Sequence, residues 1–197
     1  MSQSHLYVSA VKFELQPLLE VNPDVDVYEF GIGALETESR SREIFEKTKD
    51  RDVIYVGTCG VLDKWEEPYL ISPSHTSWLP LCERIGLSWP LPALPTYSLR
   101  RFSSLRSGHV LCSTHIAKSS EVSEDIQTRL SGVRDEIFYE NLELYSFVRH
   151  ATQCRSLKVV LGVSNEVCIE GRQQWKENFR VLAKKTCDFL CAEHNGQ

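Results

Sequence analysis

Short apolar runs alternate with longer amphipathic stretches along most of the chain. Residues 25–30, Val-Asp-Val-Tyr-Glu-Phe, alternate between apolar and polar, as a half-buried strand does. Residues 159–163 are instead continuously apolar, which is typical of a strand buried on both faces of a parallel sheet. The predicted strands are residues 6–11, 25–30, 52–56, 109–112, 136–139 and 159–163. The predicted helices are residues 13–20, 35–49, 123–130, 140–150 and 172–192.

This order of strands and helices predicts an α/β fold built from right-handed crossovers. We expect residues 1–197 to form a single domain, a three-layer α/β/α arrangement around a central mixed, largely parallel sheet. Residues 62–106 break the pattern, because six prolines there favour loops and short edge strands. Trp65, Trp78 and Trp89 lie in this region, where they either form an aromatic lid or subunit contact or pack on their own domain.

The composition is that of a globular domain and gives no indication of nucleic-acid binding, a membrane span or a zinc site. The 197 residues are 42% hydrophobic and 25% charged, as in one ordinary globular domain. A net charge of −5 gives no reason to expect nucleic acid as a partner, and Arg100, Arg101 and Arg106 are interpreted as a solvated loop. No apolar run is long enough to cross a membrane, and the first residues lack the signal-peptide pattern, so we expect a cytoplasmic protein. The seven cysteines lack zinc-site spacing and are expected to be reduced.

Polar residues follow several predicted strands. Ser164 and Asn165 come directly after the run 159–163, and Glu14 lies where the first strand leads into a helix. In open α/β sheets ligands bind beyond the carboxyl ends of the strands. The amide of Asn165 offers an acceptor and two donors, which match the edge of a 6-oxopurine. Taken alone, local structure suffices to explain these residues: Ser164 and Asn165 can form a cap or turn, and Glu14 can be a first-turn acid.

Two further segments have the chemistry of a ligand site. Gly31-Ile-Gly33 follows the strand 25–30, and its glycines allow a tight turn whose backbone approaches a ligand closely. Glu143 lies near the start of the helix 140–150, next to Leu142. Its carboxylate has two acceptor oxygens, which suits a vicinal diol.

Five segments, in this order and rough spacing, resemble the nucleoside phosphorylase and nucleosidase superfamily. They are Val-Ser-Ala-Val-Lys-Phe-Glu at 8–14, Phe-Gly-Ile-Gly at 30–33, Tyr-Val-Gly-Thr-Cys-Gly at 55–60, Glu-Asn-Leu-Glu at 140–143 and Val-Ser-Asn at 163–165. The acid after Ala-Val is similar to that of the nucleosidases, in which the glutamate at the position of Glu14 orients and activates the attacking water. Many phosphorylases have an arginine where this chain has Tyr55, which favours water as the nucleophile.

Within the superfamily, the Ser-Asn pair followed by Arg-Gln-Gln-Trp at 172–175 is most similar to futalosine hydrolases, which release hypoxanthine. Methylthioadenosine/S-adenosylhomocysteine nucleosidases have an aspartate in place of Asn165, which protonates N7 of adenine. An asparagine cannot supply a proton, but its amide can hold the O6/N7 edge of a leaving 6-oxopurine.

The resemblance implies a purine nucleosidase that needs no metal or organic cofactor, binds a small-molecule nucleoside and forms a homodimer. Glu14 and Asn165 would be its catalytic residues. Glu143 would hold the ribose hydroxyls, Leu142 would pack on the ribose, and Ser164 would help to bind the base. The remaining expected substrate contacts are Ala10, Val11, Ile32, Thr58, Gly60 and Ser113.

The chain also departs from the family pattern. Only residues 20–24 separate the first helix from the next strand, where typical members have a strand hairpin, and Cys168 replaces an expected glycine. Two alternatives therefore stay open. One is an adenine-specific nucleosidase or a phosphorylase of the same fold, and the other is a nucleoside-binding or interaction protein without catalytic activity.

Overall fold

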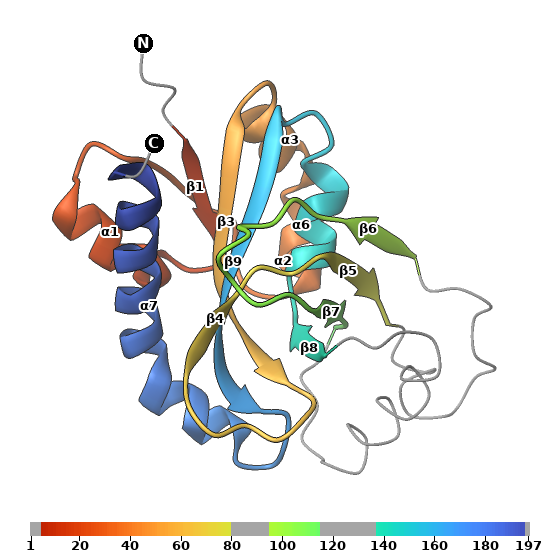
Figure 1. The fold of residues 1–197 in the computed structure, drawn as a ribbon. Helices are drawn as coiled ribbons and strands as arrows, with labels where there is room; N and C mark the ends of the chain where they lie inside the picture. The colour runs from red at the N-terminus through yellow and green to blue at the C-terminus, as the bar shows by residue number, and fades with distance from the viewer. Residues whose placement is uncertain (1–4, 80–94, 115–136, 196–197) are drawn as a thin grey trace.

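The computed structural model describes residues 5–79, 95–114 and 137–195. They form a mixed sheet of nine strands between two layers of helices (Figure 1). The strands are β1 (Leu6–Ser9), β2 (Asp26–Glu29), β3 (Asp52–Val61), β4 (Tyr69–Ile71), β5 (His75–Trp78), β6 (Thr96–Ser98), β7 (His109–Cys112), β8 (Phe138–Asn141) and β9 (Ser156–Glu166). The helices are η1 (Lys12–Glu14), α1 (Gln16–Val21), α2 (Ala34–Ser39), α3 (Ser41–Thr48), α6 (Leu144–His150) and α7 (Gly171–Asn195).

The sheet is mixed and largely parallel, as predicted. Its main path runs β2-β1-β3-β8-β7-β5-β6, and β9 lies beside β3 with β4 on its other edge. The pairs β1–β2, β1–β3, β3–β9, β5–β7 and β7–β8 are parallel, whereas β3–β8, β4–β9 and β5–β6 are antiparallel. Short edge strands in the proline-rich region are thereby confirmed for its described part, and Trp89 lies outside the described residues.

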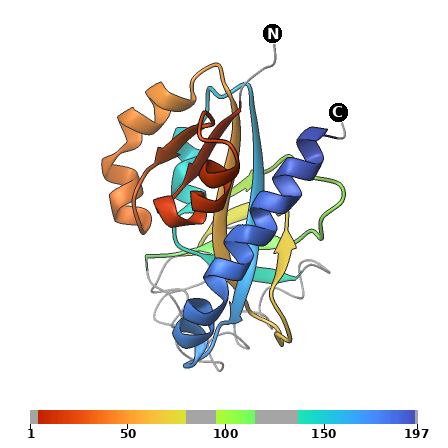
Figure 2. The same cartoon turned by 90° about the vertical axis from the view of Figure 1, so that its left-hand side faces the viewer.

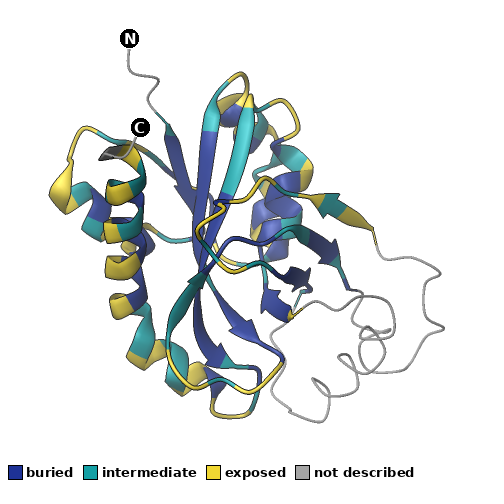
Figure 3. Cartoon of the chain, in the orientation of Figure 1, coloured by how far each residue is buried: buried dark blue, intermediate teal, exposed yellow. Residues whose placement is uncertain are grey.

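Alternation of side chains along β3 builds a core on each face of the sheet. Val53 and Tyr55 pack toward α3 and α6, and Ile54 and Val56 pack toward α1 and α7, because successive strand residues point to opposite faces. Figure 2 shows α7 lying across its face of the sheet, and Figure 3 shows buried strands beneath helices whose outer surfaces are exposed. Trp65 and Trp78 are partly buried against the first core, so these two pack on their own domain.

Two predicted strands were too short. The predicted strand 52–56 continues to Val61 as β3, and the predicted strand 159–163 extends from Ser156 to Glu166 as β9. These extensions contain glycine and polar residues, so apolar patterning misses them, and pairing between the two strands determines their length. Ser164 and Asn165 therefore lie inside a strand, not after it.

The helix predictions differ in smaller ways. The predicted helix 35–49 is divided into α2 and α3 at Arg40, and α1 begins with Pro17 in its first turn, as expected. The predicted helix 172–192 is confirmed as α7, whereas the predicted helix 123–130 lies outside the described residues. Gly162 lets α7 approach β9 closely, because a Cβ there would be 2.9 Å from Cβ of Leu182.

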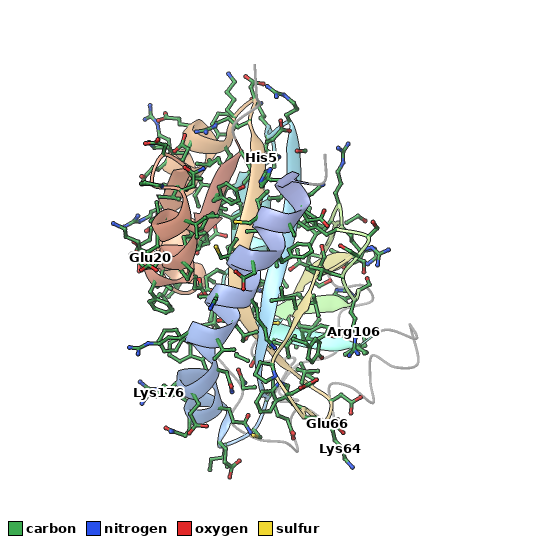
Figure 4. The ribbon with its side chains drawn as sticks, turned by 60° about the vertical axis from the view of Figure 1, so that its left-hand side comes forward. His5, Glu20, Lys64, Glu66, Arg106 and Lys176 are labelled. Carbon is green, nitrogen blue, oxygen red and sulfur yellow. The ribbon has the colours of Figure 1, made fainter. Side chains whose placement is uncertain are left out.

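Charged side chains at the rim of the fold are exposed. Figure 4 labels the exposed side chains of Glu20, Lys64, Glu66 and Lys176. Arg106, also labelled, is exposed as well, but its guanidinium lies 5.2 Å from the ring centroid of Tyr69 in β4. No helix of the described residues is both long and apolar enough to cross a membrane. Because these charged side chains are exposed, a buried carboxyl group is unusual in this fold.

Candidate functional site

Four polar side chains gather around the far end of β3. Glu14 is on η1, directly after β1; Thr58 is in β3; Glu143 precedes α6; and Asn165 is in β9. The strands β1, β3 and β9 run parallel, so their carboxyl ends lie at one edge of the sheet. The topology thus brings together residues that are far apart in the sequence.

Glu14 is a buried carboxyl group that accepts hydrogen bonds from β1 and β3, since the side chain of Ser9 and both the hydroxyl and the backbone of Thr58 act on it. Its side chain is 8% exposed, and Thr58 Oγ1 donates a hydrogen bond of 3.2 Å to its Oε1. Its other oxygen, Oε2, is buried without a hydrogen-bond partner among the described residues. Burial, and then the nearby charge of Glu143, raise the pKa of Glu14 to about 8. A buried carboxyl group whose pKa is raised toward neutral pH is suited to accept a proton from a bound molecule near that pH.

Glu143 is the second buried carboxyl group, and the backbone holds it in place. The N–H of Gly33 donates to its Oε1 at 2.8 Å, and Gly33 has a φ of 85°, which glycine adopts without strain. Burial raises the pKa of Glu143 to about 7, although the hydrogen bond from Gly33 opposes the rise. The predicted glycine turn therefore positions an acid that sequence reasoning had placed in the same site.

Asn141 connects the two acids. Its Nδ2 donates to the carbonyl oxygen of Thr58 at 2.9 Å, and its Oδ1 accepts from the backbone N–H groups of Glu143 and Leu144 at 2.9 and 2.7 Å. The amide thereby caps the start of α6 and ties it to β3. Nothing in the sequence indicated this role of Asn141, although the residue lies in the Glu-Asn-Leu-Glu segment at 140–143.

A bulge between β3 and β9 presents Ser164 and Asn165. Cys59 pairs with Val163 and Gly60 pairs with Asn165, so Ser164 is an extra residue in β9. The Ser164 hydroxyl lies 2.6 Å from Asn165 Oδ1 and 3.1 Å from the carbonyl oxygen of Cys59. Asn165 Nδ2 donates to the carbonyl oxygen of Glu166 at 2.8 Å. Each end of the amide keeps capacity for one further hydrogen bond, since Oδ1 has a second lone pair and Nδ2 a second hydrogen.

Glycines make room for the Asn165 amide. A Cβ on Gly60 would be 2.8 Å from Nδ2 of Asn165, and one on Gly171 would be 3.0 Å from the same atom. Gly60, predicted as a substrate contact, also leaves space for the Asn165 side chain.

The other predicted substrate contacts differ in exposure. Ala10 and Ser113 are buried, and Val11 and Leu142 are half-buried. Ile32 is 61% exposed on the turn that ends with Gly33. Among the described residues, no group of three or more His, Cys, Asp or Glu side chains is arranged to hold a metal ion.

Two aromatic residues, Tyr55 and Trp175, lie next to the candidate site. Tyr55 is fully buried, with its ring centroid 5.6 Å from Phe30 and 5.3 Å from Phe147, so it belongs to the core. Trp175 in α7 donates from Nε1 to Thr58 Oγ1 at 3.1 Å. Sequence reasoning missed this contact, because the spacing between residues 58 and 175 gives no sign that they meet.

Comparisons with known proteins bear on the fold. No protein-family model and no curated protein sequence matches the chain. Solved structures match it over almost its full length. A mutant 5′-methylthioadenosine/S-adenosylhomocysteine nucleosidase of Helicobacter pylori, with 5′-methylthioadenosine in its active site, has a TM-score of 0.76 at 15% identity over 100% of both chains. The chain has the nucleosidase fold.

Two other similar structures support this assignment. A mutant futalosine hydrolase of Helicobacter pylori matches 99% of this chain and 100% of its own, with a TM-score of 0.75 and 15% identity. The nucleosidase of Neisseria meningitidis in complex with methylthio-immucillin-A matches 95% of this chain and 96% of its own, with a TM-score of 0.71 and 15% identity. The fold that the resemblance implied is therefore confirmed.

Proposed function

We propose that this protein is a purine nucleosidase that hydrolyses the N-ribosidic bond of a nucleoside with a 6-oxopurine base, as futalosine hydrolases do. The observation that carries the proposal is the pair of buried acids, Glu14 and Glu143, at the same edge of the sheet as Asn165. Acids in such surroundings have raised pKa values and are characteristic of catalytic sites. The nucleosidase fold of the chain supports the same reaction class.

Glu14 is the general base of the proposed reaction. Its Oε2 accepts a proton from water as the water oxygen attacks C1′ of the ribose, and the bond between C1′ and the base nitrogen breaks through an oxocarbenium-like transition state. The electron pair of that bond moves onto the purine. Because Asn165 has no acidic proton, its amide stabilises the negative charge on the O6/N7 edge by hydrogen bonding, and solvent supplies the final proton.

Glu143 holds the sugar in this proposal. Its carboxylate accepts hydrogen bonds from the 2′- and 3′-hydroxyls, and Leu142 packs on the ribose. The backbone bond from Gly33 orients the acid before substrate arrives, which reduces the entropy cost of binding. Ala10, Val11, Ile32 and Ser113 are proposed as further substrate contacts.

Water is favoured over phosphate as the nucleophile. Tyr55 stands where many phosphorylases have an arginine, and its buried side chain contributes no positive charge to the site. An acid with a raised pKa also suits deprotonation of water better than binding of a phosphate dianion. A cytoplasmic location, a single-domain organisation and a homodimer are part of the proposal, the last through the resemblance to the family.

Product analysis tests the proposed reaction. The purified protein is incubated with inosine-type and adenosine-type nucleosides, with and without phosphate, and bases, free ribose and ribose 1-phosphate are separated. Hypoxanthine and free ribose, formed equally well without phosphate, are the expected products. Ribose 1-phosphate would indicate a phosphorylase, and preference for adenosine-type substrates would indicate an adenine nucleosidase. Calorimetric binding without release of base over a long incubation would indicate a non-catalytic nucleoside-binding protein.

A further inference from the structure

The indole of Trp175 is linked to the proposed catalytic acid through one hydroxyl. Trp175 Nε1 lies 3.1 Å from Thr58 Oγ1, and Thr58 Oγ1 lies 3.2 Å from Glu14 Oε1. An indole N–H is only a donor, so the Thr58 hydroxyl must accept from it. The single proton of the Thr58 hydroxyl is then donated to Glu14. The two hydrogen bonds form a relay in which Trp175 donates to Thr58 and Thr58 donates to Glu14.

Aromatic packing fixes the indole. The ring of Trp175 stacks on Phe179, one turn later in α7, with centroids 5.2 Å apart and an interplanar angle of 22°. It also lies 6.1 Å from the ring of Phe13, the residue before Glu14. A neighbouring side chain anchors the same helix, since Gln174 Oε1 accepts from the backbone N–H of Glu166 at 3.0 Å. The donor is thus held on a long helix that packs on the strand containing Asn165.

The relay makes the two oxygens of Glu14 different. Oε1 accepts the hydroxyl proton of Thr58, whereas Oε2 is buried without a partner among the described residues. The oxygen without a donor is the more basic of the two and is the one left to take a proton from a ligand.

We propose that Trp175 is a positioning residue that orients the Thr58 hydroxyl toward Oε1 of Glu14 and so directs proton transfer to Oε2. This inference rests on the proposed nucleosidase function. It assigns Trp175 a role in turnover without contact with the reacting atoms.

Loss of the indole donor has a defined consequence for Glu14. Without Trp175 Nε1, the Thr58 hydroxyl rotates freely, and the ionised carboxylate loses a fixed hydrogen bond, so its pKa rises. In the part of the chain that the structure describes, the other titratable groups that face Glu14 are Glu143, at the start of α6, and Tyr55 of β3. Both are unchanged by a substitution at Trp175, so a shift in the pH profile reports the relay itself.

The test is Trp175→Phe, which removes the N–H and keeps an aromatic ring. We expect kcat to fall roughly tenfold, as for loss of a hydrogen bond to a charged group, with KM changed less than about twofold. The acid limb of the kcat profile moves to higher pH. Thr58→Val added to Trp175→Phe gives little further loss, because both changes break one relay. Lys176→Gln is the control, because it changes an exposed position of the same helix without removing the indole donor or its stacking partner, and it leaves the acid limb in place.

Several results would overturn the role of Trp175. They are an unchanged kcat and pH profile for Trp175→Phe, an effect on KM alone, or losses that multiply in the double variant. If Trp175→Phe does not fold, Thr58→Val alone breaks the relay at constant side-chain size and must show the same shift of the acid limb.

A measurement without substrate separates this inference from the proposed function. The carboxyl carbon of Glu14 is observed by NMR in protein labelled at glutamate and is assigned through its absence in Glu14→Gln. Its titration midpoint must lie at higher pH in Trp175→Phe than in the unsubstituted protein. Equal midpoints would refute the relay, whereas a shifted midpoint in a protein that releases no base would uphold the relay and refute the nucleosidase function.

Discussion

At the scale of single residues, Glu14 and Glu143 are buried acids of the candidate site with raised pKa values. Burial raises the pKa of Glu14 to about 8 and that of Glu143 to about 7, although each accepts a hydrogen bond that favours its ionised form. Because the two acids interact, the pair titrates in coupled steps. We therefore expect the empty site to carry at least one proton near neutral pH.

The raised pKa values predict how stability depends on pH. Between pH 4.5 and 8 the folded protein holds protons that the unfolded chain has released, so the free energy of unfolding falls as pH rises through this window. Glu14→Gln cannot ionise and avoids part of this fall. We expect the Tm of Glu14→Gln, relative to the unsubstituted protein, to increase from pH 5 to pH 9 by about 2 to 4 °C for each ~1 kcal/mol recovered.

Thermal denaturation of the substrate-free protein at the two pH values measures this difference. Glu20→Gln is the matched control, because it is the same substitution at an exposed position of α1. A Tm difference between Glu14→Gln and the unsubstituted protein that is the same at pH 5 and pH 9 would contradict burial of an ionisable Glu14.

At the scale of elements, Asn141 joins β3 to the start of α6. Its amide donates to the carbonyl oxygen of Thr58 and accepts from the first free N–H groups of the helix. Asn141→Ala loses both contacts and is expected to lower the free energy of unfolding by about 1 to 2 kcal/mol, as loss of a helix cap does. Asn141→Asp keeps the acceptor for the cap and loses the donor to Thr58.

Urea denaturation and steady-state kinetics separate the two contributions of Asn141. We expect Asn141→Asp to retain more stability than Asn141→Ala and both variants to have reduced kcat, because Thr58 and Glu143 are no longer held together. Equal stability of the alanine variant and the unsubstituted protein would show that Asn141 does not cap α6.

The bulge between β3 and β9 leads to a second prediction about elements. A Cβ on Gly60 would be 2.8 Å from Nδ2 of Asn165 and 2.9 Å from Cγ2 of Val167, so Gly60→Ala must displace the amide. We expect base binding, measured by calorimetry with hypoxanthine, to weaken at least about tenfold, as for loss of one or two hydrogen bonds. Unchanged affinity in a folded Gly60→Ala protein would place base recognition elsewhere.

At the scale of the whole molecule, patterning predicted the architecture better than the site. The apolar runs of β1 and β9 and the alternation of β2 sufficed for a largely parallel sheet between helices. The extension of β3 through Gly57-Thr-Cys-Gly60 was missed because pairing with β9, not local propensity, makes these residues a strand. The break at Arg40 that divides α2 from α3 also left no clear signal.

The site was partly predictable for a physical reason. Polar residues at strand ends, such as Glu14, and an acid near the start of a helix, such as Glu143, are visible in the sequence because they interrupt apolar patterns. The contacts of Trp175 and Asn141 depend on how α7 and α6 pack on β3, which only the folded chain determines. The exposure of Ile32, at 61%, likewise depends on the folded turn before Gly33 and could not be inferred from its apolar side chain.

The most direct test of the account is turnover by Glu14→Gln, with Glu20→Gln as the control. Release of hypoxanthine from an inosine-type nucleoside is measured in phosphate-free buffer near pH 8, and binding of the nucleoside is measured by calorimetry. We predict that the unsubstituted protein and Glu20→Gln release base and free ribose, whereas kcat of Glu14→Gln falls at least about 100-fold with binding largely preserved. Turnover by Glu14→Gln at the rate of the control would contradict the assignment of Glu14 as the general base.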